Sequence, residues 1–259
     1  MSDRPSVDLS RLGDHDKIVL QFSGGKDSLA LLYLFKGHLH RMTVLHCDTA
    51  DQLPEMQDLV AVVESNVPNF HRVRTDAPAW IAQHGLPSDL VPIRCHPGVA
   101  NVYREAGHPI VPVTDCCAAN RWRPMQKAIR ELGPSLVIHG QRRSDEMGWD
   151  KTMQGDTTQG AGDWQVWAPI SEWSDDDVMT YLRGVGAPIL PWYSHKPHAP
   201  ECATCPASWS EGRGAYLKKH HPVLAARYGQ SLAVLLAEIS PECADLLAEW
   251  RDVTGQNDL

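Results

Sequence analysis

The chain has 259 residues, enough to bury a large core as one α/β domain or as one domain with a smaller appendage. Its formal net charge of −8 does not indicate a surface that binds nucleic acid as a whole, and the absence of an apolar run of about 18 residues argues against a membrane span. The N-terminal segment lacks the charged-then-apolar order of a signal peptide, so we expect a cytoplasmic protein that does not bind membranes.

The first predicted unit, residues 17–35, combines a buried strand, a tight loop and a buried helix. Two glycines in the loop let backbone N–H groups approach an anion, and the helix behind them adds its positive dipole end. A lysine adds charge, two serines can donate hydrogen bonds to phosphate, and an aspartate can hold Mg²⁺. We therefore predict a polyphosphate site. Its residues are Ser23, Gly24, Gly25, Lys26, Asp27 and Ser28.

These six residues read SGGKDS, which is neither the Walker loop nor the dinucleotide fingerprint. The segment resembles the pyrophosphate loop of the adenine-nucleotide α-hydrolase superfamily, which includes ATP pyrophosphatases and the phosphoadenylylsulfate (PAPS) reductase family. The resemblance implies that ATP and Mg²⁺ bind here and that Lys26 and Asp27 act in catalysis. The alternative is a glycine-rich helix start with a solvated lysine.

Strands and helices alternate beyond this unit, with strands predicted at 42–47, 70–75 and 135–139 and a helix at 54–66. Alternation implies parallel βαβ crossovers, so we predict an α/β fold with a doubly wound parallel sheet. Ligands of such sheets lie beyond the carboxyl ends of the strands. Residues 84–114 and about 141–168 break the alternation and are predicted as loops.

The C-terminal part is predicted to be helical, with a helix capped by Ser174 and others at about 209–220, 231–239 and 241–250. Ser240-Pro241 is expected to separate the last two. We accordingly predict a nucleotide-binding α/β domain at 1–172 and a helical region at 173–259.

Two further segments lie at predicted strand ends. Asp48 belongs to a stretch that resembles the LHxDTGxxxPE region of PAPS reductase relatives, with Ala50 in place of Gly; the resemblance implies contact with adenosine, and the alternative is an aspartate that ties down a turn. The second stretch resembles the family's GxRxxES segment, with Asp145-Glu146 in a shifted position. Its two arginines can bind phosphate or sulfate, or they can be solvated. The predicted nucleotide-binding residues there are Gly140, Arg142 and Arg143.

Four cysteines occur in two close pairs. Cys116-Cys117 starts a predicted helix, and Cys202-Ala-Thr-Cys205 lies far along the chain. Four thiolates can hold Zn²⁺ or an iron–sulfur cluster, and buried thiols are a further alternative. The CC…CxxC arrangement resembles that of assimilatory adenylylsulfate (APS) reductases, which implies a [4Fe–4S] cluster that the C-terminal helical region completes. Together with segments resembling CCxxxKxxP and PxxxWxxxDVxxY, the resemblance covers about residues 17–206.

Two departures from the reductase pattern guide the functional hypothesis. Reductases of this family attack the substrate sulfur with a cysteine in an ECGLH-like segment, whereas the segment around Cys243 lacks the Gly and the His. They also typically have a degraded pyrophosphate loop, whereas SGGKDS is complete. The leading hypothesis is therefore ATP-dependent adenylylation of an acceptor followed by sulfur transfer, that is, thiolation of tRNA or DNA.

Two alternatives are an APS/PAPS reductase that releases sulfite and a non-catalytic assembly or interaction factor that keeps its nucleotide and cluster sites structurally. Besides the adenine nucleotide, a sulfur- or electron-donor protein is an expected partner. The oligomeric state stays open, with a homodimer among the alternatives.

Overall fold

The protein is represented by a computed structural model that describes residues 6–99, 102, 108–144, 158–159, 164–207, 209 and 212–256. The chain divides into two compact units: unit 1 comprises Met1–Thr75 and Arg123–Glu201, and unit 2 comprises Asp76–Trp122 and Cys202–Leu259. Both units take residues from both sides of the predicted boundary between 172 and 173, and that boundary stays a prediction. Within the described ranges, none of the helices is long and apolar enough to span a membrane.

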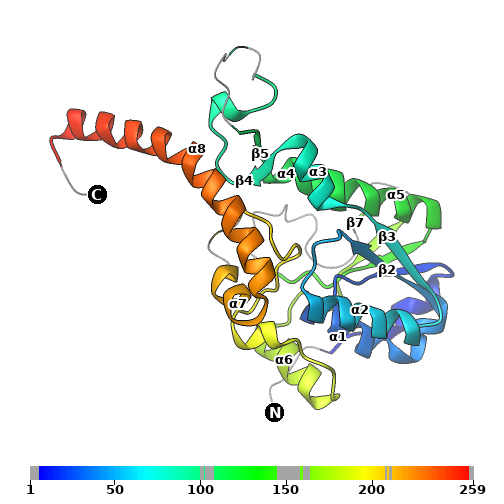
Figure 1. Cartoon of the computed structure of the whole chain (residues 1–259). Coiled ribbons are helices and arrows are strands. Elements are labelled where there is room, and N and C mark those ends of the chain that lie inside the picture. Colours follow the sequence, from blue (N-terminus) through cyan, green and yellow to red (C-terminus); the bar gives the residue numbers. More distant parts are fainter. Residues whose placement is uncertain are drawn as a thin grey trace. The chain divides into compact units, whose positions relative to one another are not determined.

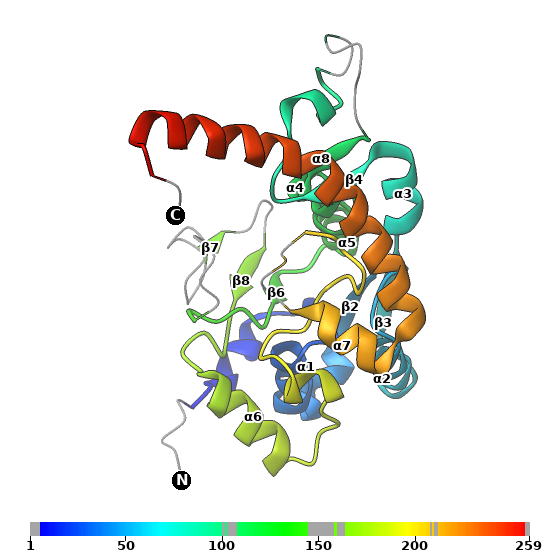
Figure 2. The ribbon, with the colours of Figure 1, turned by 60° about the vertical axis from the view of Figure 1, so that its left-hand side comes forward.

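Unit 1 is built on a six-stranded sheet with the order β3-β2-β1-β6-β8-β7. Neighbouring strands are parallel except β7, which runs antiparallel to β8 at the edge. Its α-helices and strands are β1 (Ile18–Gln21), α1 (Lys26–Leu34), β2 (Met42–Asp48), α2 (Pro54–Asn66), β3 (Phe70–Arg74), α5 (Arg123–Leu132), β6 (Leu136–Ile138), β7 (Thr158–Gln159), β8 (Gln165–Trp167) and α6 (Asp175–Gly184). Figure 1 labels most of them, and Figure 2 also labels β6 and β8.

The order of the strands confirms the predicted doubly wound α/β fold. The chain moves outward from β1 to β3 and then returns to β6 on the other side of β1. Right-handed crossovers in the two directions place their helices on opposite faces of the sheet. The order reverses between β1 and β6, where Leu20 pairs with Ile138, and ligands of such sheets bind at this switch point. The loops that follow these two strands are the SGGKDS loop and the segment from His139 to Arg143.

One face of the sheet is covered by α5. Val19, Leu45 and Val137 project from three strands to the same face, because side chains alternate along a strand. They form one buried cluster with two side chains of the α5 helix, Ala128 and Ile129. This packing fixes the ends of β1 and β6 next to each other and so positions the two loops.

The described residues of unit 2 form a short two-stranded parallel sheet and several helical elements. They are α3 (Ala77–His84), β4 (Leu86–Ser88), a 3₁₀ turn (Ile93–Cys95), β5 (Ile110–Pro112), α4 (Val113–Cys117), a π-helical turn (Ala118–Trp122), α7 (Arg213–His220) and α8 (Pro222–Thr254). The prediction of an unstructured loop over 84–114 is thus wrong for the two strands, which are only three residues long and too short to show a periodic pattern. The predicted loop at 141–168 likewise contains β8, and much of it lies outside the described residues.

Helix α8 also corrects the sequence analysis. The predicted break at Ser240-Pro241 is absent, and Pro241 lies inside one helix of 33 residues. Proline removes a backbone hydrogen bond and bends a helix without always ending it. Both Figure 1 and Figure 2 show the helix changing direction between its orange and red parts. Cys243 therefore lies within a helix and not in a first turn.

Candidate nucleotide-binding site

The SGGKDS loop is closed on itself by its two serines. The backbone N–H of Ser23 donates to Oγ of Ser28 (3.2 Å), and that hydroxyl donates to the carbonyl of Gly25 (3.0 Å). Gly24 takes a left-handed conformation with φ +89°, and a Cβ there would lie 2.8 Å from Cγ of Met56. Both the backbone shape and this close approach require glycine. The loop thus has the tight turn that the sequence predicted, leading directly into α1.

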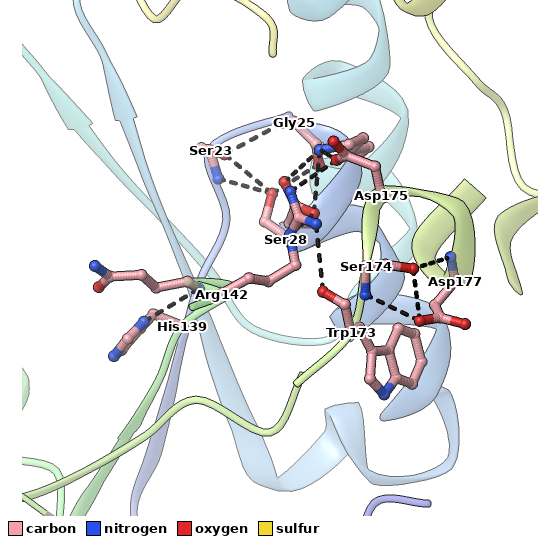
Figure 3. A network of polar contacts seen from close by, with 12 residues as sticks. Ser23, Gly25, Ser28, His139, Arg142, Trp173, Ser174, Asp175 and Asp177 are labelled. Carbon is pink, nitrogen blue, oxygen red and sulfur yellow. Dashed lines mark hydrogen bonds and ion pairs between the residues drawn. The ribbon is translucent and has the colours of Figure 1, made fainter. Parts of the chain in front are cut away.

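Two cations and two carboxylates form an ion network at the start of α1. Nζ of Lys26 lies 3.0 Å from Oδ2 of Asp27 and 2.9 Å from Oδ1 of Asp175. The guanidinium of Arg142 contacts the same carboxylates, with Nε 2.8 Å from Asp27 Oδ1 and Nη2 2.8 Å from Asp175 Oδ1. Figure 3 shows Arg142 extending toward Asp175. Each carboxylate therefore bridges both cations, and the four charges balance.

The cations of this network are buried and Asp175 is half-exposed. The side chains of Lys26 and Arg142 are 2% and 0% exposed, whereas that of Asp175 is 42% exposed. Burial would raise the pKa of Asp175, but its hydrogen bond to Lys26 and the charges of Lys26 and Arg142 outweigh burial and lower it. Asp175 is thus ionised at neutral pH and pairs with both buried cations. The alternative of a solvated Lys26 is wrong.

The Tyr193 hydroxyl accepts a hydrogen bond from the first backbone N–H of α1. The N–H of Lys26 donates to the Tyr193 hydroxyl at 2.7 Å, and Nζ of the lysine lies 5.8 Å from the centre of the tyrosine ring. Burial raises the pKa of Tyr193 far above its ordinary value, so the hydroxyl stays neutral. A ligand that used this N–H would have to displace the tyrosine.

The loop after β6 packs directly against the start of α1. A Cβ at Gly140 would lie 3.0 Å from the carbonyl carbon of Asp27 and from the N of Ser28, so only glycine fits without movement. His139 precedes it, and burial lowers the pKa of this histidine to about 4. Its neutral Nδ1 accepts a hydrogen bond from the N–H of Gln141 at 3.3 Å. Because Gly140 packs so closely on α1, Arg142 lies near enough to Asp27 to form an ion pair with it.

Arg143 does not join the ion network. Its side chain is 55% exposed, and its Nε lies 2.7 Å from Oε1 of Glu172. Adjacent residues in an irregular segment point in different directions, so only one of the two predicted arginines reaches Asp27. Asp145 and Glu146, which the sequence analysis placed in the same segment, lie outside the described residues.

Asp48 ties down the turn after β2. Its Oδ1 accepts from the N–H of Ala50 at 3.0 Å, and its Oδ2 pairs with Arg72 at 3.1 Å. Ala50 has φ +61°, a left-handed conformation that favours glycine. At the position where the family usually has Gly, this chain therefore adopts a glycine-like backbone conformation with alanine. The predicted adenosine contact of Asp48 stays a prediction.

Replacing Ala50 with glycine is expected to raise the free energy of unfolding by about 0.5–1 kcal/mol. The left-handed conformation of alanine costs the folded state roughly 1–2 kcal/mol. Glycine removes this strain, but it also raises the conformational entropy of the unfolded chain, which cancels part of the stabilisation. Urea unfolding measures the difference. Ala61→Gly, on the exposed side of α2, is the matched control and should lose about 1 kcal/mol. Equal destabilisation by both changes would contradict the strain at Ala50.

Sequence reasoning missed Asp175 and Tyr193 as members of the site. Asp175 follows Ser174, which caps α6 as predicted and also forms a capping box with Asp177. The sequence analysis interpreted the acidic residues there only as part of the helix start. The run of three aspartates was the available signal. Tyr193 is 167 residues away from Lys26 in the chain, and the sequence around it has no pattern that indicates a contact with the loop.

The two cysteine pairs lie in unit 2. Cys116 and Cys117 lie near the start of a helical stretch, as predicted: α4 begins three residues earlier at Val113, and the π-helical turn and α5 follow the two cysteines without a break. Arg213 holds the other pair by donating from Nη1 to the carbonyls of Cys202 (2.8 Å) and Cys205 (3.0 Å). Across the part of the chain that the structure describes, no three His, Cys, Asp or Glu residues form a group that could hold a metal ion.

Residues 17–207 match the family described as the phosphoadenosine phosphosulfate reductase domain. The chain is 28% identical over 181 residues to "Probable 5'-adenylylsulfate reductase 1, chloroplastic" of Oryza sativa subsp. japonica; the match covers 66% of this chain and 34% of that relative. The PAPS reductase of Candida auris in a phosphate complex aligns with a TM-score of 0.44 and 17% identity over 66% of this chain and 74% of that chain. Because the family match spans most of this chain, the chain belongs to the phosphoadenosine phosphosulfate reductase domain family.

Proposed function

We propose that the chain is a sulfonucleotide reductase, which binds an adenylyl sulfate at the switch point of unit 1 and releases sulfite. The match to the reductase family over residues 17–207 carries this proposal, because it spans both the SGGKDS loop and the Arg142 segment. The name of the rice relative supports it. Our leading hypothesis from the sequence, ATP-dependent thiolation, thereby becomes the second candidate.

The ion network suits a ligand with adjacent phosphate and sulfate groups. Lys26 and Arg142 are both committed to carboxylates, and an anion can replace Asp175 while keeping both cations paired. In the proposed reaction a thiolate attacks the sulfur, a sulfur–sulfur bond forms, and the bond to the phosphate oxygen breaks with release of AMP. Lys26 and Arg142 would stabilise the charge that develops on that phosphate.

The reaction needs a second thiol to release sulfite. That thiol attacks the sulfur of the first, a disulfide forms, and sulfite leaves with the electron pair of the broken bond, so two thiols are oxidised and the substrate sulfur is reduced. The candidate for the first thiol is Cys243, the nearest counterpart of the cysteine in the family's ECGLH-like segment, although its own segment lacks the Gly and the His; it is exposed on α8. A thiol donor supplies the second.

The complete SGGKDS loop favours the second candidate. Its glycines and Lys26 are suited to a pyrophosphate leaving group, and the two carboxylates of the network are of the type that Mg²⁺ prefers. In this reaction an acceptor oxygen attacks the α-phosphorus of ATP and pyrophosphate leaves, before sulfur transfer to tRNA or DNA. Activity at the loop is thus common to both candidates, and the products differ.

Product analysis distinguishes the two candidates. Anaerobically purified protein is incubated with adenylyl sulfate and a dithiol, or with ATP, Mg²⁺ and nucleic acid. We expect sulfite and AMP in the first mixture and no pyrophosphate in the second. Pyrophosphate from ATP without sulfite would overturn the reductase in favour of thiolation, and neither product would leave a nucleotide-binding protein without catalysis.

A [4Fe–4S] cluster on Cys116, Cys117, Cys202 and Cys205 remains a separate proposal. It is supported by the resemblance and by the presence of both pairs in one unit, with the second pair held by Arg213. No step of the proposed reaction depends on the cluster. Anaerobic protein should show the broad visible absorption of thiolate-bound iron and lose it in Cys205→Ser. Stoichiometric zinc without iron would exclude the cluster.

A further inference from the structure

An apolar stripe runs along the last turns of α8. We name Leu246, Trp250 and Val253 the distal stripe; Ile239 and Cys243 precede them at the same alternating spacing of four and three residues. Such spacing keeps side chains on one side of a helix and is the pattern of helices that pack against another helix. Leu246 and Val253 are nevertheless 72% and 77% exposed.

The distal stripe continues the face by which α8 packs into unit 2. Upstream, Leu235 is buried and Ile239 is partly buried in a cluster with Cys95 and Ile110. Arg94 adds ion pairs to Glu238 (2.6 Å) and Glu242 (3.1 Å) of the same helix. Beyond Glu242 the apolar side chains continue, but the helix is exposed or half-exposed at every described position to its end. In Figure 2 this red part extends past β4 and α4 of the same unit.

Acidic side chains border the distal stripe along one edge. At 100° per residue, Glu242, Asp245, Glu249 and Asp252 fall on the same side of the stripe. The only basic residue in the segment 240–254 is Arg251, so a second copy of the chain would bring one cation to meet these acids. A helix that carries Lys or Arg beside its own apolar stripe would complement both the apolar face and the charge.

We propose that the distal stripe and its acidic edge form a docking site for a basic amphipathic helix of a partner protein. Docking would bury the leucine and valine that the unbound chain exposes, and it would neutralise the acids on the edge. It would also stabilise the helical turns that follow Pro241, which are exposed or half-exposed throughout. The distal stripe begins next to Cys243, the thiol proposed for the reaction, but peptide binding to it can be measured whether or not that reaction occurs.

The test uses the full chain and two synthetic helical peptides of four heptads. Both carry leucine at the apolar positions, and their flanking positions carry either lysine or glutamate. Calorimetry is expected to show binding of the lysine peptide at least about tenfold tighter than the glutamate peptide at low salt, with a smaller difference at high salt. Hydrogen exchange should slow at residues 243–254 when the lysine peptide binds.

Leu246→Ser is expected to weaken binding of the lysine peptide about tenfold, because the lost apolar surface would be buried at the interface. Ala248→Ser, an exposed change away from the distal stripe, is the matched control and should bind like the original chain. Equal binding of both peptides, or no effect of Leu246→Ser, would overturn the proposal. Sedimentation as a dimer that Leu246→Ser dissociates would also overturn it and identify a second copy as the occupant.

Discussion

Lys26→Ala should weaken adenine-nucleotide binding by about 1.5–3 kcal/mol, or roughly 10- to 150-fold, the range for a hydrogen bond to a charged group. Lys26 is a buried cation at the start of α1, and Asp175 contacts it at the position that we propose for a phosphate or sulfate oxygen. Calorimetric titration with ATP, adenylyl sulfate and AMP measures the effect. Thermal unfolding must accompany it, because the change leaves Asp27 and Asp175 with Arg142 as their shared cation.

Two variants serve as controls for this experiment. Lys36→Ala removes an exposed lysine just beyond the other end of α1 and should leave affinity unchanged. Asp175→Asn removes the carboxylate that competes with the ligand and should strengthen binding, in the direction opposite to Lys26→Ala. A folded Lys26→Ala protein with undiminished affinity would refute the assignment of the site, whichever reaction the protein catalyses.

The second large effect is expected from Cys243→Ser. If Cys243 is the nucleophile of a sulfonucleotide reductase, its loss should reduce sulfite formation by roughly 10⁴-fold or more while nucleotide binding is retained. A serine on the exposed surface of α8 changes stability little, so the loss would not arise from unfolding. The measurements are sulfite release with a dithiol donor and binding of the sulfonucleotide by calorimetry.

Retained sulfite release in Cys243→Ser would exclude this thiol as the nucleophile, and a search by single substitution of the other cysteines would follow. The matched control is Ser240→Ala, one turn earlier on the same helix, which removes a hydroxyl without affecting a thiol. Loss of activity in both variants would point to the helix and not to the sulfur. We expect sulfite release to be lost in Cys243→Ser and retained in Ser240→Ala.

Local patterns predicted the sheet and the loop well. The β1 strand, the glycine loop and α1 occur in one continuous stretch, so periodicity and turn residues define them without long-range information. The helix at Pro54–Asn66 has the predicted bounds because proline at its first position marks the start. The strand ends then meet at the switch point as the rules for parallel sheets require.

The rest of the site depended on contacts between distant segments. The partners of Lys26 include Asp175, which helix capping already explained, and Tyr193, whose segment has no periodicity. Which of two adjacent arginines reaches Asp27 is set by the packing of Gly140 on α1, and a sequence pattern does not show it. The continuation of α8 through Pro241 likewise depends on packing upstream, where Arg94 and the apolar cluster hold the helix.

The balanced ion network makes ligand binding at this site a competition. An arriving anion must remove Asp175 from Lys26 and Arg142, and a ligand that uses the first N–H of α1 must also remove the Tyr193 hydroxyl. The measured affinity would then be the difference between two sets of charge-assisted hydrogen bonds. Chloride or a lone carboxylate gains little over the resident aspartate, whereas a doubly charged phosphoryl or sulfuryl group offers more oxygens to the same two cations. The site would in this way exclude the abundant simple anions of its surroundings while remaining open to nucleotides.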